Sequence, residues 1–268
     1  MKNDNRPIGI FDSGLGGLTV VAELRKEMPC ESIIYLGDTA RVPYGDKSPE
    51  NIAKFAIQDA EFLVEKGVKL IIAACNTVSA VALTKVQDSF PKIPIFGVLE
   101  AGVTACIDEK PDSVTIIGTR ATILSDAYRK GIHFLNPSIH VQSIATPLFV
   151  PIVEEGLQDS FIAKIAIEMY LQRVIEKPSD VLLLACTHYP LLKKSLSELL
   201  PKKIKIIDSA ESCAKFTMKK LAEMEMEARC GQKGFEKFYV TDMPGNFYQQ
   251  AKRFLSRDLE YFEKVSLC

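Results

Sequence analysis

The chain lacks features that mark several whole classes of protein. Its 268 residues carry 33 lysines and arginines against 34 aspartates and glutamates, so no charge excess attracts it to nucleic acid or to an anionic membrane. No apolar run reaches the roughly 18 residues of a transmembrane helix, and the longest apolar stretch, near residues 70–83, is interrupted by polar side chains. We therefore expect neither a nucleic-acid partner nor a membrane-spanning segment.

Secretion and metal signals are also missing. The N-terminus has no apolar segment of a signal peptide, and the seven cysteines are odd in number with no Cys-x-x-Cys pair. A disulfide framework is therefore not expected, and we predict a cytoplasmic protein with reduced thiols. His133 and His140 have no metal-ligand partner at useful spacing, and Cys186-x-His188 supplies too few ligands for zinc, so no metal site is predicted.

Apolar runs alternate with helical patterns along the chain. Hydrophobic residues make up 47% and charged residues 25% of the sequence, which is ordinary for a globular protein. Short β-branched runs predict strands at residues 7–11, 32–36, 68–74, 93–98, 113–117, 140–144, 180–185 and 203–207. Periodic stretches between them predict helices at residues 18–27, 48–66, 78–89, 123–132, 161–175 and 191–199. This alternation indicates an α/β fold with parallel sheets covered on both faces.

Part of this pattern repeats. Leu-Ile-Ile-Ala-Ala-Cys-Asn-Thr at 70–77 resembles Val-Leu-Leu-Leu-Ala-Cys-Thr-His at 181–188, and a further apolar run follows each at the same spacing. We therefore expect two pseudo-symmetric lobes, each a parallel four-stranded sheet flanked by helices, with the active site in the cleft between them. Residues 1–98 plus 209–268 form lobe one in this interpretation, and residues 99–208 form lobe two.

The repeat brings two cysteines to equivalent positions. Cys75 and Cys186 each stand where an apolar strand ends and a polar turn begins, and ligands of open α/β sheets bind beyond the carboxyl ends of the strands. A helix N-terminus at such a turn favours thiolate, which suits a general base. Two buried structural thiols are the alternative. The residues that follow the cysteines offer hydrogen-bond donors to a carboxylate: Asn76, Thr77, Thr187 and His188.

A glycine-rich loop follows the first predicted strand. Its sequence, Asp12-Ser13-Gly14-Leu15-Gly16-Gly17, permits a tight turn and a close backbone approach to an anion. The dinucleotide fingerprint fails because Thr19 occupies the place of its third glycine, although Asp38 ends the second strand where a ribose-binding acid would lie. Asp12 suits an ammonium group or the support of a nearby base, with helix capping as its alternative role.

Three further segments contribute candidates. Tyr44 and Gly45 lie in a loop after the second strand, where Tyr44 offers a hydroxyl group. Thr119 and Thr122 begin the first turn of lobe two, where they bind an anion or cap the following helix. Glu154 lies on a possible helix and is either a surface acid or a residue that positions an amine.

Four of these motifs together resemble the glutamate racemase family. They run in order from about residue 8 to 210, as Phe11-Asp12-Ser13-Gly14-x-Gly16-Gly17-Leu18-Thr19, Tyr35-Leu36-Gly37-Asp38-Thr39-Ala40-Arg41-x-Pro43-Tyr44-Gly45, Ala74-Cys75-Asn76-Thr77 and Cys186-Thr187-His188-Tyr189-Pro190. The resemblance implies racemisation of glutamate by two cysteines without a cofactor, to supply D-glutamate for peptidoglycan. It also implies a homodimer.

The same resemblance implies a role for each candidate. Cys75 acts on D-glutamate with help from Asp12, and Cys186 acts on L-glutamate with help from His188. The carboxylates and the amine of the substrate are held by Asp12, Ser13, Tyr44, Gly45, Asn76, Thr77, Thr119, Thr122, Glu154, Thr187 and His188.

Other functions stay open at this point. Aspartate racemase, hydantoin racemase and maleate isomerase share the paired cysteines, although the strings Cys-Thr-His-Tyr-Pro and Pro-Tyr-Gly favour glutamate. If the chain were a regulatory protein that binds a macromolecule through this fold, alkylation of the thiols would leave its binding unchanged. A nucleotide-binding enzyme would gain thermal stability from added NAD or ATP.

Overall fold

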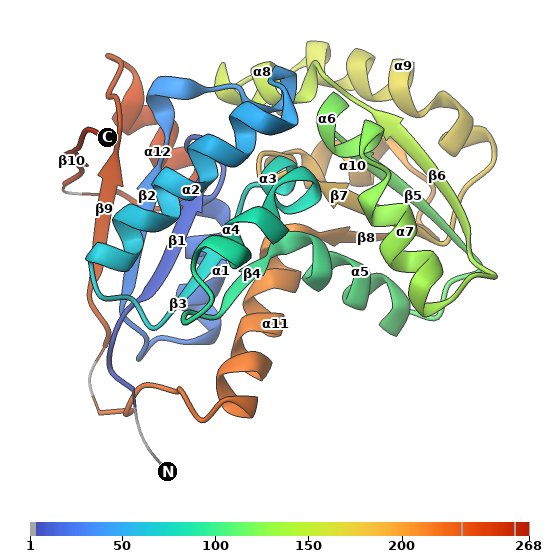
Figure 1. Cartoon of the computed structure of the whole chain (residues 1–268). Helices are drawn as coiled ribbons and strands as arrows, with labels where there is room; N and C mark the ends of the chain where they lie inside the picture. Colours follow the sequence, from blue (N-terminus) through green and yellow to red (C-terminus); the bar gives the residue numbers. More distant parts are fainter. Residues whose placement is uncertain (1–3, 232, 260, 268) are drawn as a thin grey trace.

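Two parallel β-sheets flanked by helices make up the molecule (Figure 1). The computed structural model describes residues 4–231, 233–259 and 261–267. The α/β class with two parallel sheets is therefore confirmed. Among the described helices, none combines the length and the apolar character needed to cross a membrane.

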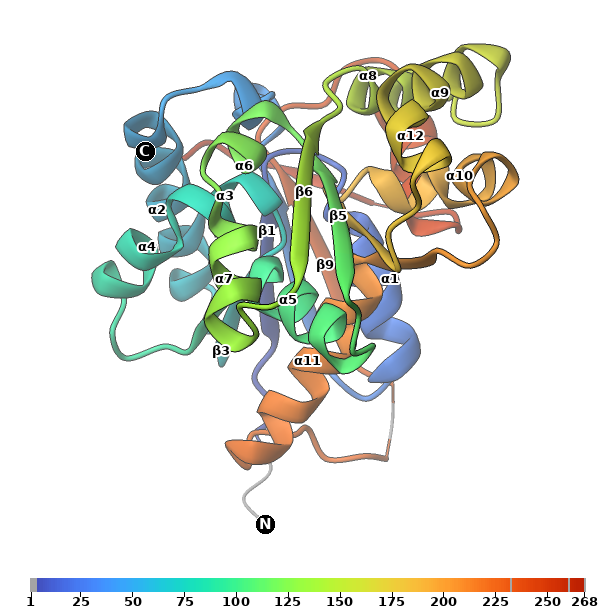
Figure 2. The same ribbon diagram turned by 90° about the vertical axis from the view of Figure 1, so that its right-hand side faces the viewer.

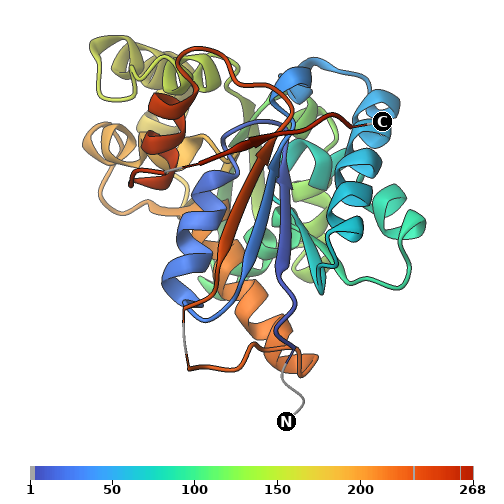
Figure 3. The same ribbon diagram turned by 90° about the vertical axis from the view of Figure 1, so that its left-hand side faces the viewer.

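The first sheet has six strands in the order β10-β9-β2-β1-β3-β4, all of them parallel. These strands are β1 (Ile8–Asp12), β2 (Ile33–Gly37), β3 (Leu70–Ala73), β4 (Ile95–Gly97), β9 (Glu236–Val240) and β10 (Glu263–Lys264). The expected four strands are thus corrected to six, because the C-terminal part of the chain adds β9 beside β2 and β10 beside β9. Figure 3 shows this added edge from the side.

The second sheet has the predicted four strands, in the order β6-β5-β7-β8, and all are parallel. They are β5 (Ser113–Gly118), β6 (His140–Ala145), β7 (Val181–Ala185) and β8 (Lys205–Asp208). Here β5 lies between β6 and β7, just as β1 lies between β2 and β3 in the first sheet. Cys75 and Cys186 therefore follow topologically equivalent strands, as the repeat predicts.

Helices cover both faces of each sheet. In the first sheet, α1 and α12 lie on one face and α2, α3 and α4 on the other (Figure 3). In the second, α5 and α7 lie on one face and α9 and α10 on the other (Figure 2). The helices are α1 (Leu18–Glu27), α2 (Pro49–Glu65), α3 (Asn76–Val81), α4 (Leu83–Ser89), α5 (Val98–Asp108), α6 (Arg120–Leu124), α7 (Ala127–Leu135), α8 (Phe149–Glu154), α9 (Phe161–Glu176), α10 (Lys193–Leu199), α11 (Ser209–Glu223) and α12 (Phe247–Leu255), with 3₁₀ turns η1 (Thr39–Arg41), η2 (Tyr44–Asp46) and η3 (Tyr189–Leu192).

Two predicted helices are interrupted. The backbone leaves the helical region at Ala82 (φ −133°), so the predicted helix at 78–89 is divided into α3 and α4. Asp126 adopts a left-handed conformation (φ 57°), which Asp tolerates better than most residues, and it separates α6 from α7 within the predicted helix at 123–132.

One of the hydrophobic clusters extends through both sheets. The cluster that contains Leu18 of α1 and Ile10 of β1 continues without a break to Leu184 of β7 and Ile167 of α9. Helix α11 packs against both α1 and α5, so it joins the two halves of the chain (Figures 1 and 2). The carboxyl ends of β3 and β7 are thereby held facing a common space.

Candidate active site

A cavity of about 310 Å³ opens beyond the carboxyl ends of the strands. Both halves of the chain contribute to its wall, which consists of Ser13, Gly14, Val42, Pro43, Tyr44, Gly45, Asp46, Cys75, Asn76, Thr77, Thr119, Arg120, Pro147, Val150, Pro151, Glu154, Cys186, Thr187 and His188. The site residues predicted from the sequence are all in this wall except Asp12 and Thr122, which lie behind it.

Cys75 reaches the cavity from the first sheet, directly before α3. Its side chain is 5% exposed, and its thiol donates a hydrogen bond to Ser13 Oγ over 3.6 Å. Burial, and after it the charge of the neighbouring Asp12, raise the pKa of Cys75 to about 12, whereas the hydrogen bonds from the Val78 amide and Ser13 act in the opposite direction. The Val78 amide at the start of α3 favours thiolate, as expected, but burial and the nearby Asp12 carboxyl group outweigh it.

Cys186 reaches the same cavity from the second sheet, directly after β7. Its Sγ lies 3.9 Å from Nδ1 of His188, and Nε2 of that imidazole lies 3.0 Å from Oε1 of Glu154. Burial alone would lower the pKa of His188, but the hydrogen bonds to Cys186 and Glu154 outweigh it and raise the pKa to about 10. A cationic ring therefore stands beside Cys186 at neutral pH.

The glycine-rich loop packs the two halves of the site together. A Cβ on Gly16 would lie 2.3 Å from Thr187 Oγ1 and 2.5 Å from His188 Nδ1, so only glycine fits. Thr19 Oγ1 also donates a hydrogen bond to the Thr187 carbonyl over 3.1 Å. The loop thus serves close packing against the second cysteine turn, a role that the sequence pattern did not distinguish from anion binding.

Asp12 is completely buried at the end of β1. Its Oδ2 accepts a hydrogen bond from the Gly14 amide over 3.1 Å, whereas Oδ1 has no hydrogen-bond partner. Burial raises the pKa of Asp12, and the charge of His188 partly offsets this effect. Asp12 does not cap α1, whose N-cap is Gly17, so its alternative role as a helix cap is excluded.

A polar cluster fixes the turn after Cys75 against the second half of the chain. Asn76 accepts a hydrogen bond from the Tyr128 hydroxyl and donates one to Ser209 Oγ over 3.2 Å, so one amide hydrogen is left for a ligand. Thr77 Oγ1 lies 3.1 Å from Thr119 Oγ1, and Thr119 in turn lies 3.0 Å from Thr122 Oγ1. Thr119 also caps α6 by accepting a hydrogen bond from the Thr122 amide, which is its predicted capping role, while anion binding stays a prediction.

Tyr44 contributes to the cavity wall, but its hydroxyl group points elsewhere. The hydroxyl hydrogen-bonds to Asp38 and, over 3.1 Å, to Asp59, and both carboxyl groups are paired with Arg41. Asp38 also accepts a hydrogen bond from Thr241. The carboxyl group of Asp38 is thus buried and already bonded to side chains of the protein, so it is not free to bind a ribose. This removes the support for a nucleotide site.

The sequence interpretation missed two charged residues of the cavity wall and an aromatic residue that packs on His188. Arg120 and Asp46 lie in the cavity wall on opposite halves of the chain, with Arg120 Nη1 3.7 Å from Asp46 Oδ1. Phe254 of α12 packs edge-on against the His188 ring, with ring centroids 5.0 Å apart. The charge of Arg120 beside Thr119 was a signal that could have been used, whereas nothing local marks Phe254.

Comparisons with known proteins show which family the chain resembles in sequence and structure. The family described as Asp/Glu/Hydantoin racemase matches residues 18–217. The chain is 43% identical to a glutamate racemase of Geobacter metallireducens over 98% of this chain and 97% of that protein, and 44% identical to one of Chlorobium phaeobacteroides over 97% and 96%. A crystal structure of glutamate racemase from Francisella tularensis in complex with D-glutamate superposes with a TM-score of 0.92, at 42% identity and 98% coverage of both chains.

Proposed function

The chain belongs to the Asp/Glu/hydantoin racemase family and, within it, to the glutamate racemases, and we propose that it interconverts L- and D-glutamate with Cys75 and Cys186 as its two acid–base groups. The observation that carries this proposal is the presence of both thiols in one cavity wall, each supplied by a different sheet. Two bases on opposite sides of Cα invert the centre, whereas a single base returns the proton to the face from which it came.

In the direction from L- to D-glutamate, the Cys186 thiolate takes the Cα proton and the Cys75 thiol gives its own proton to the opposite face. The product leaves with Cys186 as thiol and Cys75 as thiolate. Exchange with solvent then restores the starting protonation. No electrons change hands, and one proton is taken up for each one released.

The charges around the thiols suit this first direction. Burial raises the pKa of Cys75 to about 12, so in the empty site Cys75 is a thiol that is ready to donate. The sulfur of Cys186 lies 3.9 Å from Nδ1 of His188, so the two groups can exchange a proton. We therefore propose that Cys75 holds the proton that is delivered when L-glutamate is converted. Because enantiomers have equal free energy, kcat/KM must still be equal in both directions, and the asymmetry resides in kcat and KM.

The remaining wall residues supply the groups that a dicarboxylic amino acid requires. Hydrogen-bond donors for the two carboxylates of the substrate are provided by the hydroxyl and amide groups of Ser13, Asn76, Thr77, Thr119 and Thr187. Glu154 is a carboxylate of the cavity wall that lies 3.0 Å from His188 Nε2, and we propose that it orients the substrate ammonium. Asp12 and Thr122 act from behind the wall as positioning residues for Cys75 and Thr119.

Three further proposals rest on the family resemblance alone. They are that the D-glutamate formed enters peptidoglycan, that the enzyme is cytoplasmic, and that it is a homodimer. Disruption of the gene should impose a growth requirement for D-glutamate, and sedimentation of the purified protein should give twice the mass of the chain.

Proton NMR of L-glutamate with the enzyme in D₂O, combined with optical rotation, tests the proposed reaction. Loss of the Cα proton signal together with decay of the rotation is the expected result, and prior alkylation of the thiols should abolish both. L-Aspartate run in parallel serves as the control for the related racemases. Turnover of aspartate but not glutamate would overturn the substrate assignment.

A further inference from the structure

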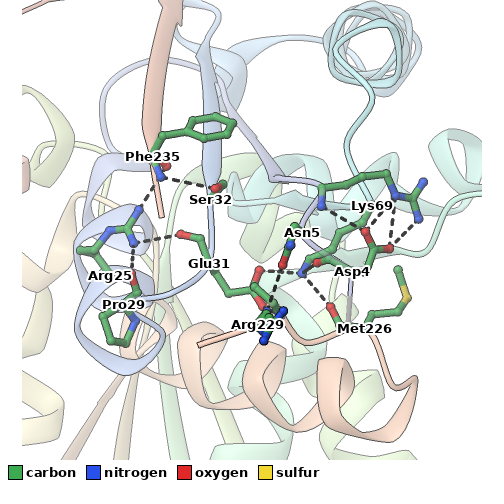
Figure 4. Close-up of polar contacts among 12 residues, drawn as sticks. Asp4, Asn5, Arg25, Pro29, Glu31, Ser32, Lys69, Met226, Arg229 and Phe235 are labelled. Atoms are coloured by element: carbon green, nitrogen blue, oxygen red, sulfur yellow. Dashed lines mark hydrogen bonds and ion pairs between the residues drawn. The ribbon is translucent and has the colours of Figure 1, made fainter. Parts of the chain in front are cut away.

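The segment between α11 and β9 is held by hydrogen bonds against the turn between α1 and β2 (Figure 4). This contact, which we call the clasp, lies at the end of the first sheet opposite the cavity. Buried Lys69 donates hydrogen bonds to the carbonyls of Asp4 and Met226 over 2.8 and 2.7 Å, and it lies 2.6 Å from a carboxylate oxygen of Glu31. The other oxygen of Glu31 accepts a hydrogen bond from the Ala228 amide over 2.7 Å.

The clasp continues on the other side of the same segment. The Gly234 amide donates to the Pro29 carbonyl over 3.0 Å, and Arg25 donates to the carbonyls of Pro29 and Phe235. A Cβ on Gly234 would lie 2.1 Å from the Glu31 carbonyl oxygen, so the two backbones are in direct contact. Residues far apart in the sequence are thus held side by side by several independent hydrogen bonds.

Two free cysteines lie within this clasp. Cys30 lies between Pro29 and Glu31 in the turn. Cys230 lies between Ala228, whose amide is bound by Glu31, and Gly234, whose amide is bound by Pro29. Their side chains are hydrogen-bonded to one another, Cys230 is exposed and Cys30 is half-buried. The other described cysteines, Cys75, Cys106, Cys186 and Cys213, are all buried.

We propose that Cys30 and Cys230 form a reversible disulfide and are the site at which mild oxidants modify this protein. Backbone and side-chain hydrogen bonds on either side of Cys30 and Cys230 hold their two segments together, and Cys230 is exposed to solvent. The catalytic thiols of the proposed function are buried at the opposite edge of the sheet, so the same oxidants reach them more slowly. This inference does not depend on the reaction proposed above.

A small disulfide such as glutathione disulfide supplies the oxidising equivalents. One protein thiolate attacks it and releases one glutathione thiolate, which gives a mixed disulfide. The second protein thiolate then attacks the protein sulfur of that mixed disulfide and releases the second glutathione. The protein loses two hydrogens in total, and the glutathione disulfide gains them as two thiols. Because the hydrogen bond to Cys30 raises the pKa of Cys230, the exchange should be faster at alkaline pH.

The bond would join two segments separated by most of the chain. A cross-link across so long a loop stabilises the fold chiefly by restricting the unfolded chain. We therefore expect oxidation to raise the melting temperature by at least about 4 °C. Racemase activity should change little, because the clasp lies away from the cavity.

Mass spectrometry of the full chain tests the proposal. The reduced protein is incubated with glutathione disulfide, blocked with N-ethylmaleimide and digested without reduction. We expect a linked peptide pair that contains Cys30 and Cys230, two fewer maleimide labels than in the reduced protein, and reversal of both by dithiothreitol. The melting temperatures of the oxidised and reduced forms are compared in parallel.

Cys30→Ser and Cys230→Ser are the matched variants. Each should lose the linked peptide and the thermal shift, and Cys30→Ser should instead carry glutathione on Cys230. A wild-type protein that carries glutathione on Cys230 without the linked pair would overturn the proposal. So would linkage of two chains through Cys230, or a bond between Cys75 and Cys186 that forms first.

Discussion

Gly16 lies so close to His188 that a Cβ on Gly16 would stand 2.5 Å from the imidazole Nδ1. That nitrogen is the one facing Cys186, 3.9 Å from its sulfur. The glycine-rich loop of the first half therefore sets the position of the acid–base pair in the second half. The two halves of the cavity therefore meet in direct contact at Gly16.

Gly16→Ala tests this contact. The added methyl group must displace His188 and Thr187, so we expect a loss of about 1–3 kcal/mol in the free energy of unfolding. A displacement of about 1 Å at a catalytic group should lower kcat/KM about 100-fold. Steady-state kinetics and thermal unfolding give the two values. Gly245→Ala is the matched control, since no atom lies within 4 Å of its Cβ position, and equal effects in both variants would contradict the account.

Replacement of either cysteine should abolish turnover in both directions. Cys75→Ser and Cys186→Ser keep a side chain of similar size but lose an acid–base group, and we expect kcat/KM to fall at least about 100-fold each way. Circular dichroism should show an unchanged fold. Cys30→Ser, which removes a thiol outside the cavity, should retain activity. Inversion at more than a few percent of the wild-type rate in either cavity variant would exclude the two-base assignment.

His188 should stay protonated well above neutral pH. Although burial opposes its charge, the hydrogen bonds to Cys186 and Glu154 raise its pKa from 6.5 to about 10. Because the folded-state pKa is raised, the stabilisation is complete below about pH 6.5 and is lost as the pH rises through about 10. NMR titration of the imidazole nitrogens checks this, since the chain has only 3 histidines.

Glu154→Gln provides the comparison for that titration. Loss of the carboxylate should lower the pKa of His188 and flatten the dependence of the melting temperature on pH between these limits. A wild-type His188 that titrates near 6.5, or a variant with an unchanged profile, would contradict the assigned network.

Tyr44→Phe should destabilise the part of the cavity wall that Tyr44 forms. The hydroxyl lies between Asp38 and Asp59, and the pKa of Asp59 is raised by its burial and by Asp38. Loss of the hydroxyl leaves these buried carboxyl groups short of a donor, which should cost about 1–3 kcal/mol of folding free energy. The effect on catalysis should fall mainly on KM. Tyr261→Phe, at a ring that is 67% exposed, is the control and should match the wild type.

The sequence predicted the parts of the fold that depend on local patterns. The strands that end before Cys75 and Cys186 are continuous apolar runs followed by polar turns, and parallel topology then places their carboxyl ends at one edge. The shared apolar pattern predicted two sheets of one design, and the observed strand orders around β1 and β5 are equivalent. Strand β9 was missed because Glu236 and Lys237 at its start read as surface residues, and only pairing with β2 makes it a strand.

The electrostatics of the site could not be predicted in the same way. A helix N-terminus after Cys75 is a local feature, but the burial that raises the pKa of its thiol depends on the packing of the whole cavity wall. The contact between Phe254 and His188 likewise joins residues that no local pattern relates. Long-range packing, rather than the choice of residues, decides these properties.

In the proposed mechanism, the two thiols act on opposite faces of Cα. We would measure deuterium at Cα in both enantiomers during the first few percent of turnover of L-glutamate in D₂O, after chiral separation. The account predicts that all D-glutamate formed carries deuterium, because the opposing thiol has exchanged with solvent, while the remaining L-glutamate keeps its proton. D-Glutamate that retains the original proton would contradict it, because the same group would then have removed and returned that proton.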